Sequence, residues 1–228
     1  MYASSVLPAP VKSCKMPPTE SCGMPQQIDL RVVELICSRL CHDLISPISA
    51  INNGIELVTE VGEEARADAD ILIAESAVSA SRRLRAFRYA YGLAGQDVGI
   101  DEIRNVALAY FEGTKTQVDW PPISVALPQG AGKVILNFLL LTPEIVRGTS
   151  QVSLSASPGE IALQYKGSNA KLDEDLGAAL NGAVLSDNLD PRTAHAVLTA
   201  AQAARIGCTI VHTSSGTDAV NIRLHWKA

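Results

Sequence analysis

The chain has 228 residues, enough for one or two domains with a hydrophobic core. Asp and Glu number 24 against 19 Lys and Arg, and the net charge of -5 excludes the basic surface of a general nucleic-acid binder. Apolar residues make up 47% and aromatic residues only 4%, which excludes a disordered chain and favours helices packed through slim side chains.

Neither a membrane span nor a disulfide framework is expected. No apolar run approaches the roughly 18 residues of a transmembrane helix, and the first residues lack the continuous apolar core of a signal peptide. The five cysteines are odd in number and irregularly spaced, which favours free thiols in a reducing compartment. We therefore expect a cytoplasmic protein in which residues 1–26, rich in Pro, Ser and Thr, form a flexible tail.

Two long helices are predicted next, over residues 28–59 and 65–91, because apolar residues recur every three or four positions. Pro47 interrupts the first helix. Since proline has no amide hydrogen, it should kink the helix and free a backbone carbonyl near residue 43. An acidic turn joins the helices, and Gly92 and Gly95 should end the second one.

The two helices predict an antiparallel hairpin over residues 27–94. A lone hairpin cannot cover both of its apolar sides, so it should dimerise into a four-helix bundle or pack on the rest of the chain. The residues expected along its contact face are Val33, Ile36, Leu40, Leu44, Ile48, Ile51, Ile55 and Val58 in the first helix and Ile71, Ala74, Val78, Ser81, Leu84 or Arg85, and Phe87 in the second.

Residues 95–228 alternate between helical and strand patterns, and Asp101 should cap the first helix. The sequence Ser157-Pro158-Gly159 signals a hairpin between two strands. The fold class is thus a helical hairpin followed by an α+β sandwich, a mostly antiparallel sheet with helices on one face. The predicted helices are 101–110, 133–141, 173–180 and 191–206, and the predicted strands are QVDWP (117–121), 151–156, 160–165, 208–213 and 219–226.

The stretch LCHDLISPI, residues 40–48, carries the chemistry. His42 is followed directly by an acidic residue and, five positions later, by a proline, on a long helix that opens a hairpin. This pattern resembles the phospho-acceptor H-box of sensor histidine kinases and histidine phosphotransferases. An imidazole nitrogen is nucleophilic near neutral pH, and helical spacing places His42 off the apolar face, where a partner can reach it. Asp43 can hydrogen-bond the ring and hold its tautomer.

Three arginines, Arg82, Arg83 and Arg85, should lie level with His42, because they follow the hairpin turn by about as many residues as His42 precedes it. They could steady phosphoryl oxygens or pair with acidic groups of a docking domain, or they could be an ordinary basic helix end. The candidate docking surface for a receiver domain consists of Ile45, Ser46 and Ser49 on the first helix and Arg83, Phe87 and Arg88 on the second.

No metal site is expected. Cys37 and Cys41 are four residues apart, but no other ligand pair is evident, so we expect both to be buried in the helical bundle. His195, His212 and His225 show no acidic partner or motif in the sequence, and packing is the expected role of each.

The second half resembles the ATP-binding domain of sensor kinases in its order of elements. Asn137, in VILNFLLL, resembles the asparagine that binds nucleotide and magnesium there. The D-x-G-x-G turn is replaced by KGSNA, where Lys166 stands in place of the aspartate that accepts a hydrogen bond from adenine. The glycine-rich phosphate loop is replaced by DPRTA, whose bulkier residues block the approach of phosphate to the backbone. We therefore expect no ATP binding and no ATP-dependent kinase activity.

An H-box hairpin followed by a degenerate ATPase-like domain is similar, over about residues 27–228, to the ChpT family of alphaproteobacterial histidine phosphotransferases. The segments CHDLISPISAINNGIELV, KVILNFLLL and PRTAHAVLTAAQAARIGCTIV carry the resemblance. It implies a Bergerat-like sandwich and a homodimer formed through the hairpins. It also implies a phosphorelay in which His42 takes a phosphoryl group from the receiver aspartate of a hybrid histidine kinase. The group then passes to response regulators, including the cell-cycle transcription factor CtrA, and the receiver supplies Mg²⁺.

Two other functions fit the same residues. A divergent histidine kinase catalytic core would bind Mg·ATP and phosphorylate itself, whereas a non-catalytic adaptor would bind receivers and block them. The phosphorylated imidazole nitrogen is also open, although the resemblance to kinase bundles suggests Nε2. Neither a nucleic acid nor a membrane is expected as a partner.

Overall fold

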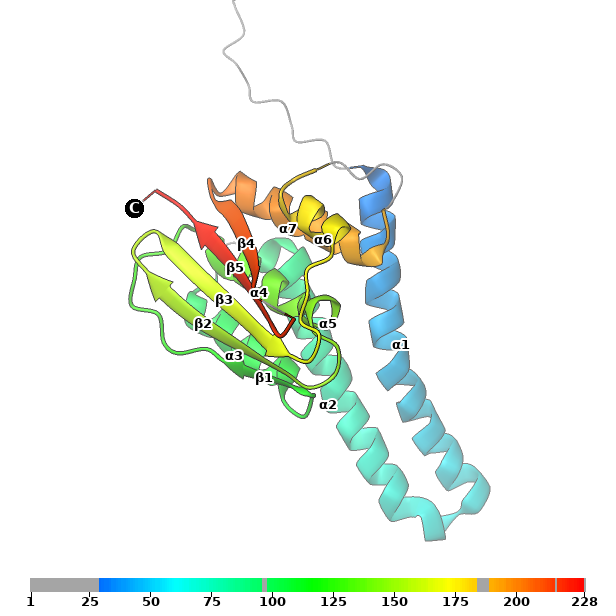
Figure 1. The fold of residues 1–228 in the computed structure, drawn as a ribbon. Coiled ribbons are helices and arrows are strands. Elements are labelled where there is room, and N and C mark those ends of the chain that lie inside the picture. Colours follow the sequence, from blue (N-terminus) through cyan, green and yellow to red (C-terminus); the bar gives the residue numbers. More distant parts are fainter. Residues whose placement is uncertain (1–28, 96–97, 184–188, 216, 228) are drawn as a thin grey trace, which may run out of the picture.

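The computed structural model describes residues 29–95, 98–183, 189–215 and 217–227. Two long helices stand side by side, and a sheet with its helices packs against their upper part, so that the lower end of the pair projects freely (Figure 1). The predicted tail, residues 1–26, lies outside the described residues. The division of the remaining chain at residues 27–94 and 95–228 stays a prediction.

The two long helices run in opposite directions and lie within two residues of their predicted ranges. Asp29 caps the first of them, because its side chain accepts a hydrogen bond from the Arg31 amide. Gly62, with φ of +84°, follows it and allows the chain to turn. The elements are α1 (Leu30–Val61), the 3-10 helix η1 (Glu63–Ala65) and α2 (Arg66–Tyr91).

Small side chains form the contact between α1 and α2. Gly54 is buried, and a Cβ atom added there would lie 2.6 Å from Ile73 Cγ1 and 3.3 Å from the Ala69 carbonyl oxygen. Within a single chain the predicted contact face is only partly covered, since the small residues bring the backbones close and leave larger side chains turned to solvent. The exposed large residues that were predicted on it are Val33, Ile48, Ile55, Ile71, Val78 and Leu84.

The helices after the hairpin are η2 (Leu93–Gly95), α3 (Ile100–Phe111), α4 (Ala131–Leu140), α5 (Thr142–Ile145), α6 (Glu174–Leu180) and α7 (Pro191–Arg205). Gly99, and not the predicted Asp101, is the N-cap of α3. Helix α4 ends before Pro143 as predicted, and Pro143 is the second residue of α5, a short helix that was not predicted. Asp190 and Thr193 form a capping box at the start of α7.

Five strands form one mixed sheet in the order β1-β2-β3-β5-β4. They are β1 (Thr116–Asp119), β2 (Ser150–Ser157), β3 (Glu160–Gly167), β4 (Thr209–Ser215) and β5 (Ala219–His225). The β1–β2 pair is parallel and the other three pairs are antiparallel, which confirms the predicted, mostly antiparallel sheet. Gly159, with φ of +82°, makes the tight turn between β2 and β3.

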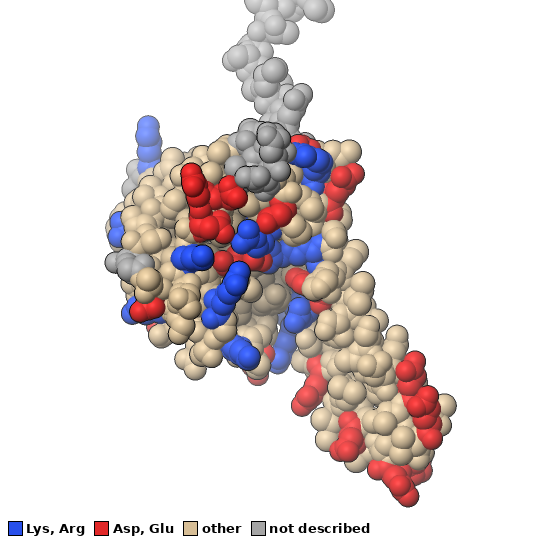
Figure 2. Space-filling view, turned by 45° about the vertical axis from the view of Figure 1, so that its right-hand side comes forward, with Lys and Arg blue, Asp and Glu red and all other residues tan. Residues whose placement is uncertain are grey.

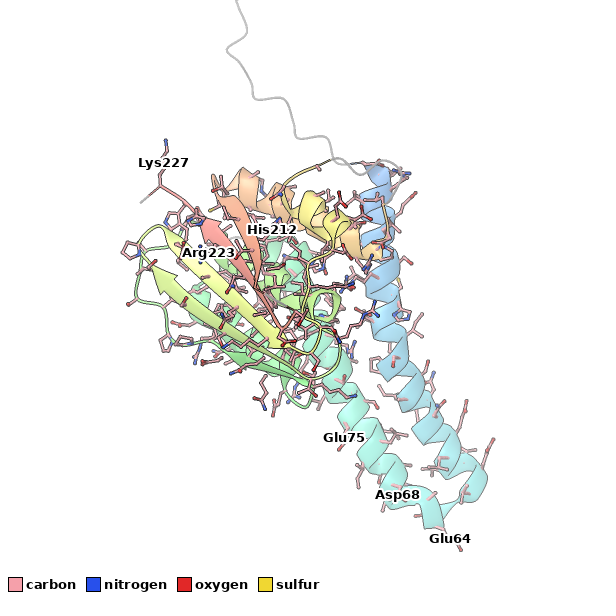
Figure 3. The ribbon with its side chains drawn as sticks, viewed as in Figure 1. Glu64, Asp68, Glu75, His212, Arg223 and Lys227 are labelled. Atoms are coloured by element: carbon pink, nitrogen blue, oxygen red, sulfur yellow. The ribbon has the colours of Figure 1, made fainter. Side chains whose placement is uncertain are left out.

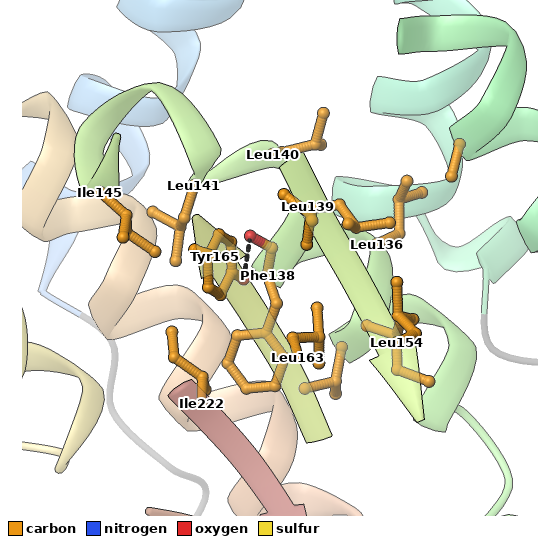
Figure 4. Close-up of a cluster of buried hydrophobic side chains, with 14 of the residues drawn as sticks. Leu136, Phe138, Leu139, Leu140, Leu141, Ile145, Leu154, Leu163, Tyr165 and Ile222 are labelled. Carbon is orange, nitrogen blue, oxygen red and sulfur yellow. Dashed lines mark hydrogen bonds between the residues drawn. The ribbon is translucent and has the colours of Figure 1, made fainter. Parts of the chain in front are cut away.

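The main core lies between the sheet and the helices behind it in Figure 1, with α4 at its centre. Nine of the ten residues of α4 are buried, so protein surrounds this helix on all sides. Figure 4 shows Phe138 in a cluster with Leu163 and Ile222 from the sheet. The Tyr165 hydroxyl donates a hydrogen bond of 2.9 Å to the Phe138 carbonyl, which satisfies the buried phenol.

Helix α7 packs against the upper part of α1. Val32 and Ile36 of α1 form a second buried apolar cluster with Ala194 of α7. These elements come from opposite ends of the sequence, so the cluster joins the beginning of the hairpin to the last third of the chain.

The free end of the hairpin is acidic, and Figure 2 shows Asp and Glu side chains gathered there. Glu64, Asp68 and Glu75 lie on this part of the hairpin (Figure 3). Asp68 lies in the first turn of α2, where the helix dipole favours negative charge. Of the helices in the described residues, none combines the length and apolar character that crossing a membrane requires.

Candidate functional site

His42 lies on α1 with 89% of its side chain exposed. Its Nδ1 atom is 3.3 Å from Asp43 Oδ1, and the Asp43 side chain is only 24% exposed. When Nδ1 carries the proton, it donates a hydrogen bond to the Asp43 carboxylate, and Nε2 keeps its lone pair. The arrangement therefore favours an exposed imidazole with Nε2 as the nucleophile.

Pro47 is buried inside α1 and alters the hydrogen bonding one turn earlier. Because proline has no amide hydrogen, the Asp43 carbonyl loses its usual helical donor. Arg83 of α2 replaces that donor, since its Nη1 atom lies 3.3 Å from the Asp43 oxygen. The carbonyl predicted to be free near residue 43 is thus satisfied from the opposite helix, directly beside His42.

Two of the three arginines predicted to lie level with His42 point toward α3. Arg82 forms an ion pair with Glu112, just beyond α3, and Arg85 forms one with Glu102 on α3. The hydrogen bond from Arg85 lowers the pKa of the exposed Glu102 carboxyl. Arg82 and Arg85 therefore tie α2 to the second part of the chain.

Phe87 was predicted to belong to a docking surface, and this prediction is wrong. Its side chain is only 6% exposed and lies in the main core, with its ring centroid 5.9 Å from that of Tyr91 and 6.3 Å from that of Tyr110. Tyr110 belongs to α3, so the face of α2 that carries Phe87 is covered and no partner can reach it.

The other predicted docking residues remain accessible to different degrees. Ile45 is 60% exposed, and Ser46, Ser49 and Arg88 are also exposed, whereas Arg83 is half-buried. A groove of about 740 Å³ runs between α2 and the end of α3, and Ser79, Arg83 and Tyr110 are among the residues that line it. Docking at these residues stays a prediction.

Asn137, predicted to correspond to a nucleotide-binding asparagine, is fully buried. Its Nδ2 atom has two hydrogens and lies within hydrogen-bond distance of three acceptors, which are the Ala90 carbonyl at 3.0 Å, the Lys133 carbonyl at 2.9 Å and Gln202 Oε1 at 2.9 Å. Its Oδ1 atom lies 2.9 Å from His195 Nε2. Both ends of this amide are therefore occupied by neighbouring protein groups.

A family model for the histidine phosphotransferase C-terminal domain matches residues 100–218, which are 119 of the 228 residues. The chain belongs to the histidine phosphotransferase family. It is 42% identical over 139 residues to the protein phosphotransferase ChpT of Brucella abortus (strain 2308). That match covers 59% of this chain and 61% of the relative, so the chain spans about three fifths of the relative's length. A solved structure of a bacterial phosphotransferase is 32% identical, with a TM-score of 0.73, and the match covers 88% of this chain and 98% of that one.

Sequence reasoning missed a contact that holds the second part of this histidine phosphotransferase against α1. Arg39, about one turn before His42, forms an ion pair of 3.1 Å with Glu144 of α5, and its Nη2 atom lies 3.4 Å from the Leu140 carbonyl oxygen. Both charged side chains are largely buried, at 15% and 17% exposed. Neither residue belongs to a motif and they are far apart in the sequence, so no signal in the sequence could have paired them.

The cysteines of the chain differ from expectation, and the remaining histidines contact neighbouring protein groups. Cys37 and Cys41, predicted to be buried, are exposed on α1. His212 lies 3.2 Å from the Gly177 carbonyl, and His225 has an acidic neighbour, Glu160, at 3.5 Å. Within the described ranges, no three His, Cys, Asp or Glu side chains gather as a metal site would require.

His195 is expected to make the stability of this histidine phosphotransferase depend on pH. Full burial, and to a lesser extent the charge of Arg39, lowers its pKa well below the ordinary value of 6.5. Below pH 6.5 the unfolded chain binds a proton at His195 that the folded chain does not bind. The stability that the buried neutral ring contributes is therefore fully present above pH 6.5 and is lost as the pH falls. The free energy of unfolding should decrease by up to about 1.4 kcal/mol per pH unit.

Urea unfolding between about pH 5.5 and about pH 7.5 measures this slope. The variant His195→Gln should be less stable at the higher pH and should lose the slope, whereas His212→Gln, at a half-buried position, should keep it. An equal slope in wild type and His195→Gln would assign the pH dependence to other groups.

Proposed function

We propose that this chain is the phosphohistidine intermediate of a two-component phosphorelay. The observation that carries the proposal is the exposed imidazole of His42, whose Nδ1 lies beside Asp43. The Nε2 lone pair attacks the phosphorus of an aspartyl phosphate on a receiver domain. A nitrogen–phosphorus bond forms, the bond from phosphorus to the aspartyl oxygen breaks, and the receiver carboxylate leaves. The reverse reaction passes the phosphoryl group to the aspartate of a second receiver.

We infer that no nucleotide takes part in this reaction. The amide of Asn137 is engaged by protein groups on both ends, and Lys166 stands where a kinase of this type has an adenine-binding aspartate. Mg²⁺ would come with the receiver domain, whose acidic pocket holds it. The phosphotransferase itself would contribute the histidine and the surface around it.

The exposed apolar residues of the hairpin support a homodimer. Ile48, Ile55, Ile71 and Val78 are between 47% and 57% exposed and lie in the halves of α1 and α2 nearer the turn that joins them. Side chains of this kind rarely face water in a contiguous group. A second hairpin packed on them would bury them and complete a four-helix bundle.

The proposed partners are the receiver domain of a hybrid histidine kinase as donor and response regulators as acceptors, including a CtrA-like transcription factor of the cell cycle. The proposed docking surface consists of Ile45, Ser46 and Ser49 on α1 with Arg83 and Arg88 on α2. An apolar side chain and cations beside the acceptor suit a receiver whose own site is acidic. We propose that these encounters take place in the cytoplasm.

A reconstituted relay tests the proposal, with a phosphorylated receiver domain, this chain and a second receiver. We expect labelled phosphate to appear first on the chain and then on the second receiver. The label on the chain should survive alkali and be lost in acid, because it is a nitrogen–phosphorus bond.

The same experiment separates the alternatives. Labelling of the chain by Mg·ATP alone would identify a divergent kinase core. Tight binding of a receiver with no label passing in either direction would identify an adaptor. Either result would contradict the phosphotransferase proposal.

Arg83→Glu is expected to slow transfer from a receiver more than it lowers stability. The change removes the hydrogen bond to the Asp43 carbonyl and places a negative charge where an acidic pocket would approach. Like charges facing each other at an interface are costly, and a transfer about tenfold slower is expected. Rapid-quench transfer kinetics measure it, with Arg66→Glu at the free end of the hairpin as the matched control. Kinetics equal to wild type would remove Arg83 from the docking surface.

A further inference from the structure

Side chains from α4 and α7 hold the C-terminal end of α2. The Ala90 carbonyl accepts hydrogen bonds of 3.0 Å from Asn137 Nδ2 and 3.2 Å from Gln202 Nε2, and the Gly92 carbonyl accepts one of 2.7 Å from Lys133 Nζ. The last carbonyls of an α-helix have no helical donors. These three side chains supply the missing donors from elements that belong to the second part of the chain.

The side chains of Asn137 and Gln202 also contact each other, and Asn137 contacts the backbone of Lys133. Asn137 Nδ2 also reaches the Lys133 carbonyl and Gln202 Oε1, both at 2.9 Å. Asn137 Oδ1 lies 2.9 Å from His195 Nε2, which is 3.3 Å from the Tyr91 hydroxyl at the end of α2. Because buried hydrogen bonds in such a network support one another, α2, α4 and α7 can change their relative positions only by breaking several of them together.

This network lies close to the proposed docking surface. Ala90 follows Arg83 by seven residues, so it lies about 10 Å further along α2, on the rise of 1.5 Å per residue. The hydrogen bonds that orient α4 and the sheet on the hairpin therefore lie about two helical turns from Arg83, which contacts the Asp43 carbonyl.

We propose that Lys133, Asn137 and Gln202 are positioning residues, which hold the second part of the chain in one orientation on the hairpin. A receiver at His42 then meets the hairpin and the second part as one fixed surface. The inference rests on the proposed phosphotransfer function. It also gives Asn137 a role: this residue holds the end of α2, whereas the corresponding asparagine of a kinase would bind nucleotide. Transfer requires that the two proteins hold the attacking nitrogen and the phosphorus in line. Loss of the hydrogen bonds from Lys133 and Gln202 should therefore slow transfer from a receiver without changing His42 itself.

The double variant Lys133→Met, Gln202→Met tests the inference directly. Spin labels introduced as non-natural amino acids at Glu75 on α2 and Gln151 on β2 report the orientation of the two parts, with labelled chains diluted into unlabelled ones. Wild type and the control Lys115→Met, an exposed lysine, should give one narrow distance by pulsed electron resonance, and the double variant should lose it. If the double variant does not fold, Lys133→Met alone serves, because Lys133 lines a cavity of about 550 Å³ that admits methionine.

Transfer kinetics give the second readout. In the double variant, transfer from a receiver should fall by about tenfold to hundredfold, while labelling of His42 by the small donor phosphoramidate should keep the wild-type rate. A narrow distance in the double variant, or a broad one in wild type, would overturn the inference. If receivers fail to label the wild type, the proposed function is wrong, and the distance measurement still decides whether these residues hold the orientation of the second part.

Discussion

Replacement of His42 by glutamine is expected to abolish phosphoryl transfer in both directions. The side-chain amide of glutamine is polar and close in size, but its nitrogen has no lone pair available for attack on phosphorus. The His42 ring is 89% exposed, and its hydrogen bond is to the adjacent Asp43. The free energy of unfolding should therefore stay within about 0.5 kcal/mol of wild type. Labelling by a phosphorylated receiver and urea unfolding measure the two quantities.

The matched control for this prediction is Asp43→Asn, which keeps the acceptor and removes the carboxylate. It should still take up label, about 100-fold more slowly, because the ring loses the group that holds its tautomer. Full labelling of His42→Gln would show that another residue accepts the phosphoryl group and would contradict the assignment of His42.

The largest loss of stability is expected from Phe138→Ala. Phe138 lies in the last turn of α4, its side chain is fully buried, and it shares a cluster with Leu163 and Ile222 of the sheet (Figure 4). Removal of the ring leaves a cavity that the surrounding helix and strands cannot close. The expected cost is about 3–5 kcal/mol in the free energy of unfolding.

Urea unfolding followed by circular dichroism measures this cost. Phe138→Leu retains most of the apolar volume and should lose roughly 1.5 kcal/mol or less. If Phe138→Ala lost no more than the leucine variant, the packing of α4 against the sheet described above would be incorrect.

Local patterns in the sequence were sufficient to place most helices and strands. Apolar periodicity located α1 and α2 to within two residues, and the Pro158-Gly159 pair located the turn between β2 and β3. The Ala-rich stretch that begins at Pro191 located α7, to within one residue at its end. Each of these signals depends on a few neighbouring residues, so tertiary structure had little opportunity to override them.

Contacts between distant elements were not predictable in the same way. Phe87 and Arg85 lie on α2 near the level of His42, but α3 covers Phe87, and Arg85, 57% exposed, forms an ion pair with Glu102 of α3. The spacing of a single helix indicates which residues share a face, and it does not indicate which neighbour covers that face. Asn137 shows the same limit, because its partners Ala90 and Gln202 come from two other helices.

The position of α7 on α1 has a consequence for the order of folding. The contacts around Gly62 join residues that are close in sequence, so the tip of the hairpin can form soon after synthesis. Val32 and Ile36 pack on Ala194, which leaves the ribosome after most of the chain. The first helix therefore completes its packing only when one of the last elements arrives, and a chain cut short before α7 would display an apolar strip at its beginning.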